Sequence, residues 1–182
     1  MPGATGLMTV EEFRKLPEGA FYYELRHGEP VQVAYPKCKH ILIQNKLQFF
    51  FARHSGANFF LAVEFPFRAL PEHEFRAADV AAVSRSRFKN ADIEADFMGS
   101  PDLVVEVLSP SNTADEINDK ERLCLETGCL EFWEVDPKRQ QVRVSKPDGT
   151  ARTYKAGQEI PLDVFGAGKL PVNEIFFVSG PG

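Results

Sequence analysis

The sequence predicts one domain of mixed α/β class, in which short strands and helices alternate along the chain. Residues 101–110 carry the clearest strand signal, because β-forming residues lie there between two prolines. Their apolar character indicates a central strand that is buried on both faces. With 182 residues, 43% of them hydrophobic, and no linker that would divide it, the whole of 1–182 is expected to form one core.

The first part of the chain predicts a short helix and a β-hairpin. Thr9 followed three residues later by Glu12 has the spacing of a capping box, which predicts a helix start. Residues 21–26 and 30–34 are strand-like, and His27-Gly28 between them is typical of a tight turn. An N-terminal hairpin is therefore expected.

The next stretch predicts a helix and two strands. Apolar residues recur at helical spacing over 40–54. Residues 59–65 follow as a strand that ends at Pro66, and residues 79–83 form another strand that opens with Asp79. Residues 84–100 are charged and are expected to form a surface loop or short helix. Their cluster of basic residues could contact phosphate or simply be a solvated face.

After the central strand, a second capping box predicts a helix over 113–128, with Thr113 as the cap and Glu116 as its partner. At about 100° per residue, Lys120 lies on the same face as the apolar residues and should face the sheet. The alternative is an ordinary surface pair between Lys120 and Glu116, one turn apart.

The remainder of the chain predicts mostly strands. Residues 130–135 form a strand around Trp133, whose aromatic side chains should be core rather than interface. Residues 142–144 and 152–154 flank a Pro-Asp-Gly turn and should pair as a hairpin. Residues 158–178 resemble a tail of short strands that ends at residues 175–177.

Composition excludes several classes of protein. The net charge of −5 argues against a broad, non-specific grip on nucleic acid. No apolar run is long enough to cross a membrane, and the N-terminus lacks a secretory signal pattern, so a cytoplasmic protein without membrane contact is expected. The three cysteines have no metal-binding spacing and are expected to be free thiols.

Two acids lie within the central strand. Asp102 and Glu106 are four residues apart, so both side chains should emerge on one face of the sheet. A buried carboxylate is costly unless it is paired, protonated or bound to a metal. The simpler interpretation places Asp102 at an exposed strand mouth and gives Glu106 one basic partner.

The acids suggest a metal site. Asp79, Asp102 and Glu106 converging near a strand junction would supply the oxygen ligands that Mg²⁺ prefers, with Mn²⁺ as a substitute. A nearby Lys120 would orient or deprotonate the attacking water, or neutralise a phosphate. These are the components of phosphodiester hydrolysis.

The chain resembles the Uma2 family of restriction endonucleases, formerly a domain of unknown function, within the PD-(D/E)XK nuclease superfamily. The resemblance covers most of the chain and is carried by residues 101–111, Lys120, 128–137, Tyr23-Glu24-Leu25, Gly28-Glu29, His40 and Ala78-Asp79-Val80-Ala81. It implies a restriction-endonuclease-like core, with a mixed sheet flanked by helices and a site at one edge.

The resemblance also implies roles for individual residues. Asp79 takes the superfamily's lone-acid position and Glu106 the second acidic position. Leu108 stands where a lysine is expected two residues later, so the resemblance assigns the lysine's role to Lys120 from the next helix. Glu24 and His40 match family positions and are expected near the site, although a lone histidine in a first helical turn is more often a cap or surface residue.

The chain departs from the family at several positions, which are Ala78 for Pro, Glu116 for Asp, Cys124 for Tyr, Glu134 for an apolar residue, and a missing Arg before the second long helix.

The expected function is a Mg²⁺-dependent endonuclease acting on DNA as a homodimer. The alternatives are a catalytically silent nuclease fold that serves as a binding or assembly module, and an enzyme acting on a small phosphodiester.

Overall fold

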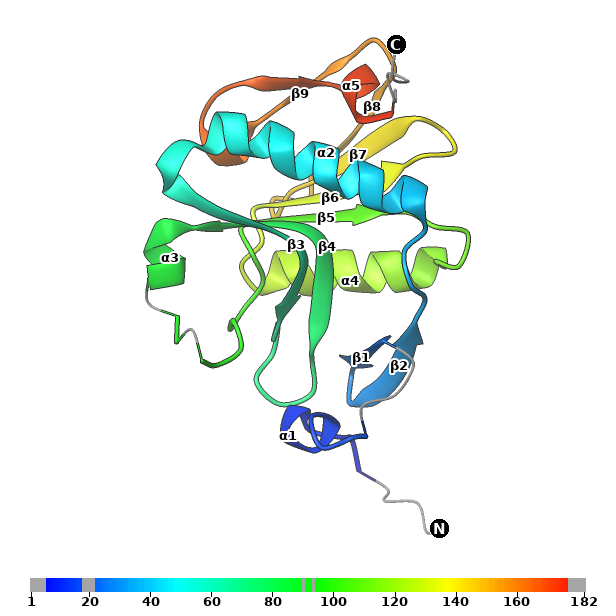
Figure 1. Ribbon diagram of the computed structural model, residues 1–182, viewed down its shortest axis with the longest axis vertical. Coiled ribbons are helices and arrows are strands. Elements are labelled where there is room, and N and C mark those ends of the chain that lie inside the picture. The colour runs from blue at the N-terminus through cyan, green and yellow to red at the C-terminus, as the bar shows by residue number, and fades with distance from the viewer. Residues whose placement is uncertain (1–5, 18–21, 90, 93, 177–182) are drawn as a thin grey trace.

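The computed structural model describes residues 6–17, 22–89, 91–92 and 94–176. Within these ranges the largest sheet has the strand order β3-β4-β5-β6-β7-β8, with β5 parallel to β6 and the other neighbours antiparallel (Figure 1). Its strands are β3 (Phe59–Phe67), β4 (Arg76–Ser84), β5 (Leu103–Val107), β6 (Glu131–Asp136), β7 (Gln141–Ser145) and β8 (Ala151–Lys155). The expected mixed α/β fold is confirmed.

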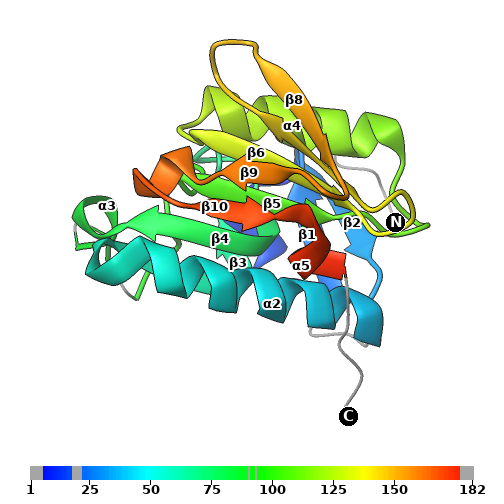
Figure 2. The same ribbon diagram turned by 90° about the horizontal axis from the view of Figure 1, so that it is seen from above.

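Two helices cover the opposite faces of this sheet, as Figure 2 shows. They are α2 (Cys38–Ser55) on one face and α4 (Ala114–Glu126) on the other. The α2 face is also covered by the C-terminal elements, because their apolar side chains share one core cluster with α2. These elements are β9 (Glu159–Pro161), η2 (Asp163–Phe165), β10 (Lys169–Pro171) and α5 (Val172–Phe176).

The expected N-terminal hairpin pairs β1 (Tyr22–Arg26) with β2 (Glu29–Val33) around the His27-Gly28 turn. A bridge between Leu25 and Phe75 joins this hairpin to the chain just before β4. The hairpin therefore lies beside the beginning of β4, below the main sheet in Figure 1. The short helices are α1 (Val10–Phe13), η1 (Gly56–Asn58) and α3 (Arg85–Lys89).

Side-chain alternation along β5 produces a core on each side of the sheet. Val105 faces the α2 layer, where the ring of Phe51 meets Trp133 edge-on at a centroid distance of 5.5 Å. Val104 faces the α4 layer with Phe132. Phe132 and Trp133 are completely buried, so the aromatic strand is core, as expected.

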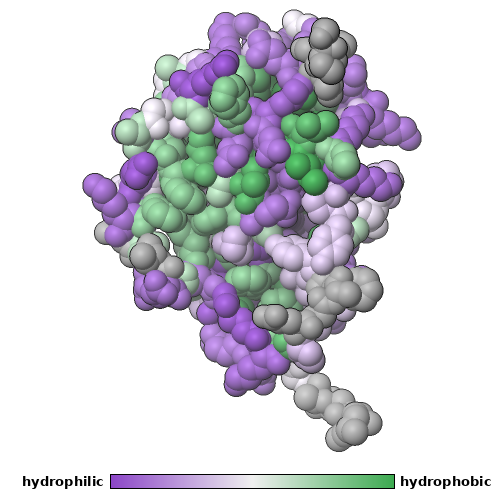
Figure 3. Space-filling view, in the orientation of Figure 1, coloured by the Kyte–Doolittle hydropathy of each residue, from purple (hydrophilic) through white to green (hydrophobic). Residues whose placement is uncertain are grey.

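The outer side of α2 carries exposed apolar residues. Ile41, Leu42 and Phe49 are solvent-accessible, and Figure 3 shows hydrophobic atoms gathered over the face that α2 crosses. Among the residues that the structure covers, no helix has the length and apolar character needed to cross a membrane.

Several element boundaries differ from the sequence-based expectation, and three of these differences change where a particular residue lies. β4 begins at Arg76, so Asp79 lies inside the strand and not at its start. β3 continues through Pro66, which is tolerated because β3 is an edge strand of this sheet. Residues 175–176 are helical, because they belong to α5. Phe21 and Phe177, at the ends of two expected strands, lie outside the described residues.

Candidate active site

The site is built where β4 and β5 separate. The two strands pair from Val80↔Val105 to Ala82↔Leu103, and the pairing stops before Asp79. There the Oδ2 atom of Asp79 accepts the backbone N–H of Val107 at 2.6 Å. A side-chain carboxylate thus takes the place of a strand carbonyl, and it holds Asp79 next to the residue that follows Glu106.

The first turns of α2 approach Asp79 from one side. His40 Nε2 lies 3.0 Å from Asp79 Oδ1, and Gln44 Nε2 donates to the same oxygen at 3.1 Å. His40 and Gln44 are one helical turn apart, so they project from the same side of the helix. Burial opposes protonation of His40, but the carboxylates of Asp79 and Glu64 outweigh it and raise the pKa of the imidazole.

Glu64 of β3 joins this group, and the sequence analysis did not select it. The flanking pairs Val63↔Val80 and Phe65↔Ala78 place Glu64 opposite Asp79. Gln44 donates a hydrogen bond to its carboxylate, while burial, aided by the charge of Asp79, raises its pKa. The signal in the sequence is a single acid within the apolar segment 59–67.

Lys120 approaches from the other face of the sheet, on α4. Its ammonium lies 2.8 Å from Glu106 Oε1, donates to the Ala77 carbonyl at 2.6 Å, and lies 3.5 Å from Glu24 Oε1. Lys120 and Glu106 are 6% and 8% exposed, so the pair is shielded from water. The alternative surface pair is absent here, since Glu116 accepts from Arg26 at 2.8 Å.

Glu24 fixes this arrangement from the hairpin. Its Oε1 accepts the N–H of Ala77 at 2.9 Å, and its Oε2 is 2.9 Å from Arg26 Nε. Burial would raise the pKa of Glu24, but the charges of Lys120 and Arg26 overcome this and lower it. Glu24 is therefore an ionised support for the ammonium.

Glu106 and Lys120 both have raised pKa values, for different reasons. Burial is the largest influence on Glu106 and raises its pKa, and repulsion from Asp79 adds to it against the attraction of Lys120. Burial would lower the pKa of Lys120, but the surrounding acids, led by Glu106, raise it. Lys120 is a permanent cation here, and the region holds more acids than it neutralises.

Tyr22 of β1 is a second neighbour that the sequence analysis did not select. Burial, helped by the charges of Glu24 and Glu64, raises the pKa of its phenol to about 12. The hydroxyl is therefore protonated at neutral pH and remains a hydrogen-bond donor at the border of the acidic cluster. In the sequence, the only sign that Tyr22 lies near the site is its position two residues before Glu24.

Asp102 is not brought into this group. Its Oδ2 accepts the N–H of Ser84 at 2.7 Å and lies 3.3 Å from Arg87 Nη1. Asp102 precedes β5, contrary to the expectation that it lies within the strand, and Glu106 lies near the other end, about 13 Å away along an extended chain. Asp102 therefore ties the end of β4 to α3, and the arginine that it holds is engaged in structure.

The group on the α2 side fits a divalent cation. His40, Glu64 and Asp79 each offer one donor atom, and these atoms lie within 4.8 Å of one another. His40 Nε2 is buried and has no aligned hydrogen-bond partner among the described residues, although Asp79 Oδ1 is close to it. A ring nitrogen and a carboxylate oxygen that face a common point are suited to sharing one ion.

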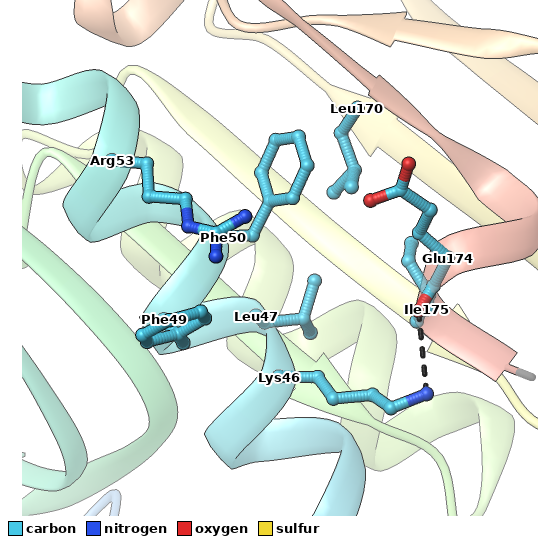
Figure 4. A pocket seen from close by; sticks show the side chains of 8 residues that line it. All are labelled: Lys46, Leu47, Phe49, Phe50, Arg53, Leu170, Glu174 and Ile175. Carbon is cyan, nitrogen blue, oxygen red and sulfur yellow. Dashed lines mark hydrogen bonds between the residues drawn. The ribbon is translucent and has the colours of Figure 1, made fainter. Parts of the chain in front are cut away.

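Two hollows lie beside the acidic group on the described surface. One of about 140 Å³ lies between α2 and the C-terminal elements (Figure 4) and is lined by Lys46, Leu47, Phe49, Phe50, Arg53, Leu170, Glu174 and Ile175. Another of about 430 Å³ lies between the hairpin and α4 and is lined by Arg26, His27, Glu29, Val31, Arg76, Asp115, Glu116 and Asp119. The second adjoins the site through Arg26, which contacts Glu24.

The Uma2 family model, described as "Putative restriction endonuclease", matches residues 10–173. The chain belongs to the Uma2 family. The match includes every site residue named above, from Tyr22 on the hairpin to Lys120 on α4. The family resemblance found in the sequence is therefore confirmed, and with it membership in a family described as nucleases.

A solved structure similar to this Uma2 chain is that of "a putative nuclease belonging to DUF820" from Anabaena variabilis. The two chains are 21% identical, the alignment covers 93% of this chain and 97% of the other, and the TM-score is 0.80. At this identity the likeness establishes the fold. No curated protein matches this Uma2 chain by sequence.

Proposed function

We propose that this protein is a metal-dependent endonuclease that hydrolyses phosphodiester bonds in DNA. The observation that carries the proposal is the buried ammonium of Lys120, which lies 2.8 Å from Glu106. Next to Glu106, the backbone N–H of Val107 donates a hydrogen bond to the carboxylate of Asp79. In this proposal Asp79 and Glu106 hold the metal, and Lys120 acts on the attacking water or the scissile phosphate. Family membership supports the reaction class.

The cation and the side chains would have different roles in hydrolysis. A bound divalent cation would supply a more acidic water and offset the charge of the phosphate. Lys120 keeps its proton, because the surrounding acids raise its pKa. It therefore orients water or stabilises phosphate charge and does not remove a proton. Glu24 and the Ala77 carbonyl fix the ammonium in place, which reduces the reorganisation needed during reaction.

The test is cleavage of supercoiled plasmid DNA with Mg²⁺ or Mn²⁺ by the wild type and by Lys120→Ala and Glu106→Ala. Both variants should lose roughly a hundredfold or more in rate, as expected for a charge that acts on the transition state. Lys155→Ala, on exposed β8, is the matched control and should cleave normally. Cleavage that persists in both site variants would reject the assigned roles.

A second candidate function is a silent nuclease fold that acts as a binding module. The surroundings of Lys120 favour this function, because its ammonium is buried and already contacts Glu106, Glu24 and Ala77. Titration calorimetry with Mg²⁺ and Mn²⁺ separates the two functions. Uptake of neither ion at millimolar concentration would support the silent module.

The proposal includes a homodimer, because two copies acting together would cut both strands of a duplex. Sedimentation velocity over a range of protein concentrations measures this directly. A monomer at every concentration, with single-strand nicking of plasmid, would leave the hydrolytic proposal in place and remove the dimer from it.

A further inference from the structure

We propose that Glu64 and His40 act with Asp79 as ligands of the cation, and that this donor set selects Mn²⁺, or a similar first-row transition ion, over Mg²⁺. The inference rests on the proposed function for the presence of a cation. It goes further by naming two ligands and the chemical class of the ion.

The spacing of the donor atoms fits a shared ion. Two ligands at right angles, each about 2.1 Å from a metal, are separated by about 3 Å. His40 Nε2 and Asp79 Oδ1 are 3.0 Å apart, and the donor atom of Glu64 lies with both inside 4.8 Å.

The ring nitrogen of His40 is buried and lies next to an oxygen of Asp79. It is buried from water and lacks an aligned hydrogen-bond partner within the described part of the chain. A buried polar atom without a hydrogen bond is costly, and such groups often mark a place where an ion or water belongs. A cation between His40 and Asp79 would satisfy both atoms at once.

Gln44 orients the two carboxylates toward the histidine. Its side-chain amide donates to Asp79 Oδ1 and to Glu64 Oε1. One amide thus holds two acids together, although two negative charges in a half-buried position repel each other. Hydrogen-bonded supports of this kind behind ligating carboxylates are typical of metal sites.

The backbone at Glu64 is strained in a way that fits a functional role. Its φ is 49°, in the left-handed region, within a strand. A non-glycine residue in that region costs about 1–2 kcal/mol. Strain of this kind persists mainly where the geometry serves a ligand or a reaction. Here the strained residue is the acid that the strand register places opposite Asp79.

The donor set decides the class of ion. Mg²⁺ is a hard cation that prefers oxygen ligands and retains several waters. Imidazole nitrogen suits first-row transition ions, and Mn²⁺, although it is nearest to Mg²⁺ in its preference for oxygen ligands, belongs to that row. A site that adds an imidazole nitrogen to its carboxylate ligands therefore favours Mn²⁺ over Mg²⁺ more strongly than carboxylates alone would.

The decisive measurement is electron spin echo envelope modulation of Mn²⁺ bound to the wild-type protein. A nitrogen ligand couples to the electron spin of Mn²⁺ and produces ¹⁴N modulation, so the wild type should show it. Titration calorimetry should also show roughly tenfold or greater preference for Mn²⁺ over Mg²⁺. Bound Mn²⁺ without ¹⁴N modulation, or equal affinity for the two ions, would overturn the inference.

Variants identify the ligands. His40→Gln should abolish the ¹⁴N modulation, and His54→Gln, on the same helix, should keep it because His54 Nδ1 contacts Phe50 O. Glu64→Gln should weaken Mn²⁺ binding by roughly tenfold or more, whereas Glu72→Gln, with a 79% exposed side chain, should not. Unchanged Mn²⁺ affinity in Glu64→Gln would contradict the role of Glu64. Circular dichroism and thermal unfolding confirm that each variant is folded.

The outcomes also separate this inference from the proposed function. ¹⁴N modulation in a protein that cleaves no DNA would sustain the metal site and remove the nuclease proposal. DNA cleavage that works equally with Mg²⁺, by a protein whose Mn²⁺ shows no nitrogen ligand, would do the opposite.

Discussion

Lys120 is a residue whose burial makes sense only through its neighbours. A lone ammonium in a protein interior is strongly disfavoured, and an ion pair offsets this only when further hydrogen bonds complete it. Lys120 has Glu106 at 2.8 Å and the Ala77 carbonyl at 2.6 Å, with Glu24 behind. A charged group maintained at this cost points to a use other than stability.

Glu64 leads to a prediction about stability. Glu64→Gly should leave the free energy of unfolding unchanged or raise it by up to about 1 kcal/mol, because glycine adopts a φ of 49° without the cost that other residues bear. Burial disfavours the ionised carboxylate of Glu64, as its raised pKa indicates, so its removal should also favour the folded state. Urea denaturation at neutral pH measures the change.

The matched control for this prediction is Val63→Gly. Val63 pairs with Val80 in the same strand and packs against the core, so glycine there should cost about 1–3 kcal/mol. If Glu64→Gly destabilises the protein as much as Val63→Gly does, the backbone at Glu64 is not the source of strain.

At the residue scale, the sequence predicted Asp79, Glu106, Lys120, Glu24 and His40, and the structure brings these five side chains into one region. Their chemical roles stay predictions. Asp102 was expected with them because strand alternation gives the face of a side chain but not its position along the strand. Glu64 could not be selected because its place depends on the register between β3 and β4.

At the scale of elements, α4 connects local sequence signals with the site. Thr113 caps the helix, and the side chain of Glu116 accepts the Thr113 N–H at 2.9 Å. The helix then has a fixed start, so Lys120 appears on the buried face with Ile117 and Cys124. The capping box and the helical spacing were readable in the sequence. The partners of Lys120 were not, because they come from β1, β4 and β5.

The capping box gives a prediction with a pH dependence. Hydrogen bonding to the Thr113 N–H and hydroxyl, together with Arg26, lowers the pKa of Glu116. A lowered pKa means stability that is present above the unfolded value of 4.5 and is lost as the pH falls through the folded value. Glu116→Gln should therefore cost about 0.5–1 kcal/mol at pH 7 and progressively less as the pH falls below 4.5. Thermal unfolding across this pH range checks it.

The control for this prediction is Glu126→Gln at the other end of α4. A negative charge at the last turn opposes the helix dipole, so its removal should leave stability equal or slightly higher at pH 7. A cost for Glu116→Gln that stays constant from pH 7 to pH 3 would contradict the charged capping box.

At the scale of the whole molecule, the sheet separates two cores. α2 and the C-terminal elements cover one face, and α4 covers the other. The site lies where both layers reach the separated ends of β4 and β5, so it draws residues from each. The layered class was predictable from alternating strands and helices. The strand order was not, because it depends on contacts between segments distant in sequence.

A core substitution tests the role of the α2 layer. Phe51→Ala should lower the free energy of unfolding by about 3–5 kcal/mol, because Phe51 is completely buried against Trp133. Phe49→Ala, two residues away and 62% exposed, should cost less than about 1 kcal/mol. Similar losses for both would mean that the α2 layer does not pack as described. Urea denaturation followed by Trp133 fluorescence distinguishes the two.

Because Lys120 is on a helix and not on the strand that carries Glu106, its position can change during evolution through substitutions elsewhere. When an acid and its basic partner share one strand, backbone pairing sets their separation. Here the separation depends on how closely α4 rests on the sheet, through buried contacts such as Leu123 and Cys124. Substitutions at those contacts would shift the ammonium relative to Glu106, so the activity proposed for this protein would change at positions that never touch a substrate.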